Sequence, residues 1–202
     1  MQPSLVNHLD RRWISLIEIM AMTAVLGLAI TAMFSTVIGG IYFARDSENR
    51  IKAISLAREG VEWVTNLRNT NWLRFSSDPI NCWKIKDYKA SCIGGPAYAW
   101  ANSLSTATYI LTNTNGAWYL TGTTSGSGLW VDTNGYYVMS GTTAPKCSID
   151  KTTDCSSPFT REIRISTTGS GIMAVTSVVD WYEKRAQNVT LTTTLTNWKS
   201  KF

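Results

Sequence analysis

One carboxylate stands at the start of a long apolar stretch of this 202-residue chain. Residues 19–44 carry no charged side chain, and Glu18 directly precedes them. A carboxylate inside an apolar helix costs about 2.5–3.5 kcal/mol on insertion scales, so such a residue normally has a partner or a function. The alternative is that Glu18 lies at the membrane edge and reaches water. The first candidate chemistry is therefore charge pairing at Glu18.

Other residues that could form a catalytic or metal site are scarce. The single histidine, His8, lies near the N-terminus, so neither histidine-based catalysis nor a histidine metal site is expected. The serines of the later part therefore lack a histidine base. The acidic residues there are scattered and give no paired-carboxylate spacing. They include Asp132, Asp150, Asp154, Asp180 and Glu183. We expect no enzyme activity, no cofactor and no metal.

Four cysteines follow the apolar stretch, at Cys82, Cys92, Cys147 and Cys155. Four cysteines allow three connectivities, and the spacing favours the local pairs Cys82–Cys92 and Cys147–Cys155. Zinc sites usually need clustered Cys-x-x-Cys ligands, which this chain lacks. Disulfides persist in oxidising compartments, so the cysteines suit an exported domain.

The uncharged stretch is long enough to cross a membrane. It spans roughly 39 Å as a helix, against a hydrocarbon core of about 30 Å. Arg11 and Arg12 precede it, whereas Arg45 behind it is offset by Asp46 and Glu48. The positive-inside rule then predicts a cytoplasmic N-terminus and an exported C-terminal part. A secretory signal has a shorter apolar core, usually ~7–15 residues, and a twin-arginine signal has no acidic residue interrupting that core.

An amphipathic pattern continues beyond the apolar stretch. Apolar residues recur every three or four positions, at Ile51, Ile54, Ala57, Val61, Val64 and Leu67. This spacing predicts that one helix extends from about residue 14 to about residue 68, with its second half lying across a sheet. Gly60 is its weak point, because glycine costs about 1 kcal/mol relative to alanine in a helix.

Strands and turns follow from about residue 71. Runs 108–111 and 117–120 flank one Asn-Gly pair, and runs 129–131 and 136–139 flank another. Asn-Gly between apolar runs is the strongest short hairpin signal, because both residues tolerate positive φ. The Gly-, Ser- and Thr-rich residues 121–128 are predicted to form a flexible surface loop.

Three more strands are predicted near the C-terminus, over residues 159–165, 173–181 and 189–195. Each alternates apolar and polar residues, so each is expected to be half-buried, and the short connections suit an antiparallel meander. The apolar residues that share a face within each strand are Phe159, Ile163 and Ile165, then Met173, Val175, Val179 and Trp181, then Val189, Leu191 and Leu195. Together with the long helix they predict an α+β fold.

Two weaker binding signals remain. Nine tryptophans favour core packing, but residues 121–141 with Trp130, Tyr136 and Tyr137 are the place for a sugar- or DNA-stacking surface. The compact basic cluster suits a solvated loop better than a DNA groove. It comprises Lys84, Lys86 and Lys89.

The segment from Ile14 to Glu18, with the apolar run behind it, resembles the N-terminus of type IV pilins and pseudopilins. In that family a membrane protease removes a short basic leader and methylates the new amine. The resemblance implies cleavage between Trp13 and Ile14, methylation of Ile14, and pairing of Glu18 with the N-terminal amine of a neighbouring subunit. Ser15 stands where the family has Thr or Ser, and Gly27 where it often has a helix-loosening glycine.

The chain departs from the family at the cleavage junction. The family has glycine immediately before the cut, where the protease site is narrow, and this chain has Trp13. Either the protease tolerates Trp13, or the chain stays uncleaved and Glu18 needs a partner other than a free amine at Ile14.

The resemblance and the residue patterns together predict four parts. These are a cytoplasmic leader (1–13), a transmembrane assembly helix (14–44), an amphipathic continuation (45–72) and an exported, disulfide-bonded sheet domain (73–202). The resemblance implies a structural subunit, of minor-pilin or pseudopilin type, in a type IV pilus or a type II secretion-like filament. Its partners would be other pilin subunits, the prepilin peptidase and an inner-membrane assembly platform.

Two alternatives use the same anchor. One is a monomeric, membrane-tethered binding module such as an adhesin or receptor, which needs neither cleavage nor pairing of Glu18. The other is a subunit of a DNA-uptake pilus, for which the mild net charge of +5 is weak support.

Overall fold

The computed structural model describes residues 16–86, 92, 103–114, 117–132, 137–138, 155–169 and 171–198. Its first element, α1, is a 59-residue helix, Leu16–Arg74, and a short helix α2 follows at Pro79–Cys82. Seven strands complete the order: β1 Ala107–Thr114, β2 Ala117–Thr123, β3 Ser127–Val131, β4 Tyr137–Val138, β5 Cys155–Thr168, β6 Ile172–Tyr182 and β7 Ala186–Thr196. The chain divides into two compact units, Met1–Glu48 and Asn49–Phe202, and α1 contributes residues to both.

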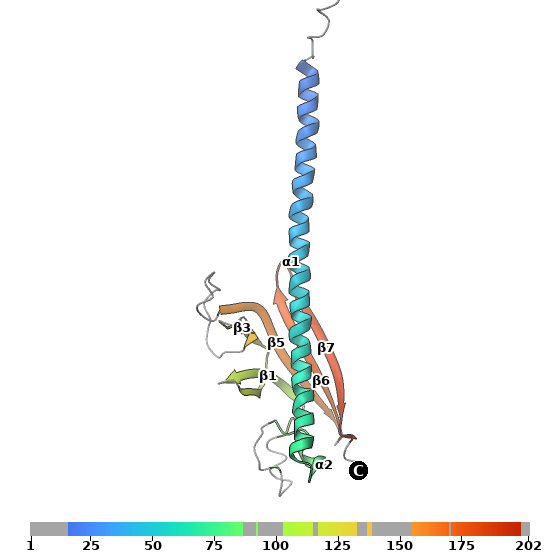
Figure 1. Cartoon of the computed structure of the whole chain (residues 1–202), viewed down its shortest axis with the longest axis vertical. Helices are drawn as coiled ribbons and strands as arrows, with labels where there is room; N and C mark the ends of the chain where they lie inside the picture. Colours follow the sequence, from blue (N-terminus) through green and yellow to red (C-terminus); the bar gives the residue numbers. More distant parts are fainter. Residues whose placement is uncertain are drawn as a thin grey trace, which may run out of the picture. The chain divides into compact units, whose positions relative to one another are not determined.

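The strands form one antiparallel sheet in which β5 is central (Figure 1). One edge of β5 pairs with β6, and β6 pairs in turn with β7. The other edge is shared: Ile163–Ile165 face β1, while residues nearer the start of β5 face β3. The expected α+β fold is confirmed, with β5 long enough to join the two hairpins to the C-terminal meander.

The strand pairing of both predicted hairpins and the three C-terminal strands are confirmed, while the two Asn-Gly pairs lie outside the described residues. Thr114 pairs with Ala117 in the first hairpin, and Val131 pairs with Tyr137 in the second. The flexible loop predicted over residues 121–128 is wrong for most of its length. Residues 121–123 belong to β2 and residues 127–128 to β3. Composition alone did not show that β1 and β5 offer free backbone groups to these Thr, Ser and Gly residues.

The second half of α1 packs on this sheet, but along a face shifted from the predicted one. Ile51 and Ile54 are 65% and 46% exposed, so their predicted burial is wrong. The later members of the predicted stripe are buried as expected. The buried helix residues are Ala53, Leu56, Ala57, Gly60, Val61, Val64, Leu67, Asn71 and Trp72. Ala53 and Gly60 gave no strong hydrophobic signal in the sequence, because alanine has only a methyl group and glycine has no side chain, but both residues are buried against the sheet.

Gly60 marks the closest approach of helix and sheet. A Cβ built on Gly60 would lie 2.6 Å from Oγ of Ser177 on β6 and 3.5 Å from Cδ1 of Ile163 on β5. Ser177 is fully buried, so its side chain has little room to move. The glycine that weakens the isolated helix is therefore what lets it pack closely on the sheet.

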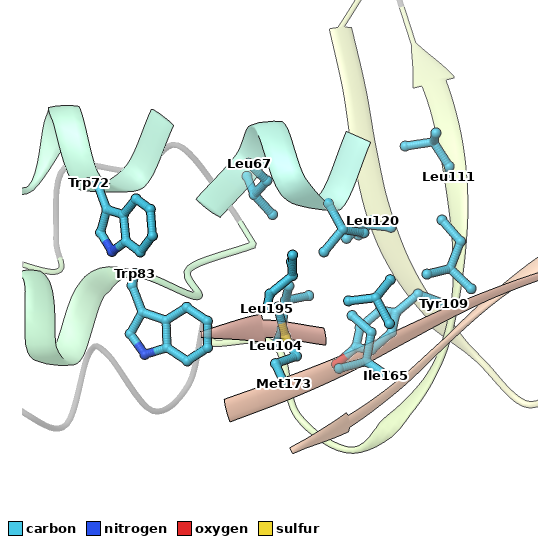
Figure 2. Packing of buried hydrophobic residues seen from close by; sticks show 13 residues of the cluster. Leu67, Trp72, Trp83, Leu104, Tyr109, Leu111, Leu120, Ile165, Met173 and Leu195 are labelled. Carbon is cyan, nitrogen blue, oxygen red and sulfur yellow. The ribbon is translucent and has the colours of Figure 1, made fainter. Parts of the chain in front are cut away.

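The core fills the space between helix and sheet. Leu67 and Trp72 of α1 belong to one buried cluster with Leu195, Met173 and Ile165 of the sheet. In Figure 2, Leu67 lies near Leu195, Trp72 lies beside Trp83, and Ile165 lies beside Tyr109. The predicted core role of the tryptophans is confirmed where they are buried, at Trp72, Trp83 and Trp181.

Polar anchors hold the end of α1. The buried Asn71 donates hydrogen bonds from Nδ2 to the carbonyl oxygens of Trp83 and Ile85, at 3.2 and 2.8 Å. The indole of Trp72 donates to Oδ1 of Asn197, directly after β7, at 3.0 Å. Buried donors and acceptors that are paired in this way fix one orientation of the helix end.

We predict that Gly60→Ala destabilises the fold although alanine is the better helix former. The added methyl group collides with Ser177, and overpacking of this kind costs about 1–3 kcal/mol against a helix-propensity gain of about 1 kcal/mol. The measurement is urea unfolding of the detergent-solubilised chain, followed by tryptophan fluorescence. Adding Ser177→Ala to Gly60→Ala should recover stability, since it removes the nearest atom. A Gly60→Ala chain at least as stable as the parent would contradict the close packing.

Candidate functional site

The uncharged segment of α1 exposes its apolar side chains. Residues 16–46 are exposed, and no part of the most hydrophobic window of the helix is buried within the protein. The described residues include this one helix that is long and apolar enough to cross a membrane. An exposed apolar surface of this length requires a lipid or protein environment.

Glu18 lies in the first turn of α1, at the start of that apolar surface. Its position near the helix N-terminus is favourable for a negative charge, because the peptide dipoles place partial positive charge there. Within the part of the chain that the structure describes, no cation forms an ion pair with Glu18. The charge is therefore available to a group outside the described residues, whether water, lipid or another chain.

The other predicted assembly residues divide into two groups. Trp13, Ile14 and Ser15 lie outside the described residues, so the cleavage junction, the methylation site and the Ser15 assembly position stay predictions. Gly27 lies in α1, and a Cβ built there would meet no atom within 4 Å. Nothing within the described chain requires a glycine at this position. Small residues in membrane helices let neighbouring helices approach, so a role for Gly27 would lie in contacts between chains.

A second charged site, which the sequence did not suggest, lies between α1 and β5. Arg161 is 1% exposed, and its Nη1 lies 3.0 Å from Oε2 of Glu59. The same nitrogen donates to the carbonyl oxygen of Leu56 at 3.3 Å. The Glu59 side chain is 41% exposed, so the carboxylate keeps contact with water while the guanidinium is buried.

Strand alternation explains why Arg161 points inward. Phe159, Ile163 and Ile165 occupy the core face of β5, and Arg161 lies on that face by the period of two. Burial lowers the pKa of Arg161, and Glu59 opposes that shift by charge attraction and by its hydrogen bond. The Glu59 carboxylate therefore stabilises a cation that the surrounding core would otherwise disfavour. The signal was in the alternation, but the partner lies 102 positions away in the sequence.

The predicted Cys82–Cys92 disulfide is confirmed, with a Cα–Cα distance of 5.9 Å. It closes the segment that follows α2 and packs with Phe75 and Ile85 in a small apolar cluster. Cys155, the first residue of β5, is also disulfide-bonded. Cys147 lies outside the described residues, so its pairing with Cys155 stays a prediction.

The described residues do not form either of the two weaker predicted binding sites, the aromatic stacking surface and the basic cluster. Tyr137 packs edge-on against Phe159 with 5.9 Å between ring centroids, so it serves the core. Trp130 is half-buried and Tyr136 lies outside the described residues. Of the predicted basic cluster, Lys84 and Lys86 are half-buried and Lys89 is not described. Among the residues whose placement is described, no three His, Cys, Asp or Glu side chains converge as metal ligands would.

Comparison with known proteins adds no relative. A scan against protein-family models, a search of curated proteins and a search of solved structures each return no match to this chain. The arrangement of helix and sheet defines the class of architecture. A long N-terminal apolar helix, packed through its later residues on an antiparallel sheet, is a pilin-like α+β architecture.

We predict that Glu59→Gln destabilises the fold by about 1–3 kcal/mol, because it leaves the buried Arg161 cation without a counter-charge. The partial exposure of Glu59 places the effect below that of a fully buried pair. Urea unfolding measures it. Adding Arg161→Met to Glu59→Gln should recover most of the loss, since an apolar side chain of similar length needs no counter-charge.

The matched control is Glu62→Gln. Glu62 forms an exposed ion pair with Arg58, in which Arg58 Nε lies 2.6 Å from Glu62 Oε1, about one helical turn from Glu59. Breaking this pair should change the free energy of unfolding by less than about 0.5 kcal/mol. Equal effects of Glu59→Gln and Glu62→Gln would contradict a structural role for the buried pair.

Proposed function

We propose that this chain is a structural subunit, of minor-pilin or pseudopilin type, in a type IV pilus or a type II secretion-like filament. Its uncharged helix anchors it in the cytoplasmic membrane before assembly and packs among other subunits afterwards. Its sheet unit is exported. Prepilin peptidase and an inner-membrane assembly platform act on it, and other pilin subunits are its partners in the filament.

The observation that carries this proposal is the exposed apolar helix with one carboxylate at its start. A simple membrane tether needs an apolar helix but gains nothing from Glu18, which weakens insertion. A subunit that assembles through this helix gains a specific contact. The amine of a neighbour, freed at Ile14, supplies the counter-charge that Glu18 does not have among the described residues.

The energetics favour assembly in one register. An ion pair in an apolar bundle offsets its desolvation only when both charges are present and close together. A subunit that is displaced along the bundle would leave both charges unpaired. Glu18 would therefore set the stagger between subunits, while dispersion contacts between helices supply the bulk of the association.

The disulfides support export of the sheet unit. Cys82 is bonded to Cys92, and Cys155 is also disulfide-bonded. Such bonds persist in oxidising compartments and are rare in the cytosol. This agrees with the charge bias around the apolar stretch, which favours a cytoplasmic N-terminus.

We predict that Glu18→Ala leaves membrane insertion intact but blocks filament assembly. Removing one partner of a buried pair costs about 3–5 kcal/mol, which corresponds to a loss of ~100-fold or more in incorporation. Resistance to alkaline extraction measures insertion, and immunoblotting of sheared filaments measures incorporation.

Asp46→Ala is the matched control, because it removes an exposed carboxylate of α1 just beyond the uncharged segment. It should insert and assemble as the parent does. Normal incorporation of Glu18→Ala would overturn the assembly role and leave a membrane-tethered binding module as the better function.

A further inference from the structure

One end of the C-terminal meander carries an open depression. It has a volume of about 280 Å³ and is formed where the start of β5, the end of β6 and the start of β7 lie side by side. Its lining includes Thr160, Asp180, Tyr182 and Asn188. Sites for small molecules usually have volumes of about 300–1,000 Å³, so this depression suits a ligand as small as a single ring.

The polar residues of the depression lie on the face of the sheet opposite the core. Trp181 is buried in the core cluster that includes helix residues, so its chain neighbours Asp180 and Tyr182 are on the other face. Asp180 pairs with Thr160 on β5 and with Asn188 on β7. These three side chains therefore form one row across three strands, and all three residues are exposed.

This row offers both kinds of hydrogen-bonding group. The hydroxyl of Thr160 donates to the carbonyl oxygen of Asp180 at 3.4 Å, which leaves the threonine oxygen as an acceptor. The Asp180 carboxylate is also an acceptor, and the Asn188 amide is both a donor and an acceptor. A hydroxyl group both donates and accepts, whereas a protonated amine only donates. The row therefore suits a ligand with several hydroxyl groups better than it suits an amine.

An exposed aromatic ring lies beside the row. Tyr182 is 71% exposed and follows Asp180 by two residues, so it lies on the same face of β6, about 7 Å further along the strand. The face of an aromatic ring is an apolar surface. A pyranose sugar has C–H groups on one face and hydroxyl groups around its rim. It can therefore stack on Tyr182 while its hydroxyl groups reach the polar row.

The charge of the depression narrows the choice of ligand. Asp180 is the one charged residue among the residues that line it. A carboxylate repels the phosphate groups of nucleic acids and of anionic lipids. A neutral sugar meets no such repulsion, and hydrogen bonds to an ionised carboxylate are stronger than those between neutral groups.

We propose that this depression binds one neutral pyranose ring of a glycan. Tyr182 stacks on the C–H face of the sugar, while Asp180 and Asn188 form hydrogen bonds with its hydroxyl groups. The site belongs to the sheet unit alone. It gives the chain a binding activity beyond the structural role proposed above, and it does not depend on assembly through the helix.

Saturation-transfer NMR on the full chain tests this proposal, in a detergent without a sugar headgroup. The probes are the methyl pyranosides of glucose, galactose, mannose and N-acetylglucosamine. At least one of them should receive saturation from the protein, because a single ring in an open site binds weakly and exchanges quickly. The strongest transfer should reach the C–H protons on one face of that sugar, since this face contacts Tyr182.

Two variants test the assigned residues by titration with the bound pyranoside. Tyr182→Ala removes the stacking surface and should raise the Kd about five-fold. Asp180→Asn keeps the shape of the side chain but removes the charged acceptor, and should raise the Kd about ten-fold. Tyr119→Ala is the control for the first variant, because Tyr119 is 43% exposed on β2. Glu62→Gln is the control for the second, because it neutralises an exposed carboxylate on α1. Both controls should bind as the parent does.

Three outcomes would overturn the proposal. The first is that none of the four pyranosides receives saturation, and the second is that both site variants bind as tightly as the parent. The third is that tetramethylammonium binds and the pyranosides do not, because a cation can use Tyr182 and Asp180 without any hydroxyl contact. The Glu18→Ala chain should bind the pyranoside as the parent does, so failure of the sugar site and failure of helix assembly are distinguishable.

Discussion

The cost of placing a charge among apolar groups is the constraint on which the account of this protein rests. In the sheet unit the buried charge is neutralised within one chain, because Glu59 lies 3.0 Å from the guanidinium of Arg161. In the N-terminal part of α1, Glu18 forms no ion pair among the described residues. The same cost explains why Arg161 is paired within the fold, and it is the physical basis for the assembly contact that we propose for Glu18.

The close contact between α1 and the sheet depends on small residues. Gly60 lets the helix backbone approach Ser177 and Ile163, and Ala53 and Ala57 continue the same face. Large side chains would raise the helix and separate Arg161 from Glu59. The ion pair and the tight packing are therefore coupled through the geometry of one helix face.

Much of this fold could be predicted from periodicity. The long helix, both hairpins and the C-terminal strands follow from helical spacing, Asn-Gly turns and alternation. The buried helix face could not be predicted fully, because a stripe that began at Ile51 and Ile54 fitted the spacing as well as the true face did. Arg161 was missed because alternation placed a charge in the core, where a charge is normally absent without a partner. That partner, Glu59, is brought close only by the packing of α1 on β5.

The mature N-terminus of the chain isolated from native membranes is the most direct test of the proposed pairing of Glu18. Peptide mass spectrometry would identify both the first residue and its modification. If Glu18 pairs with the amine of a neighbour, the mature chain begins at Ile14 and its amine is methylated. A chain that retains Met1 and residues 2–13 would contradict it, because the amine proposed as the counter-charge would not exist.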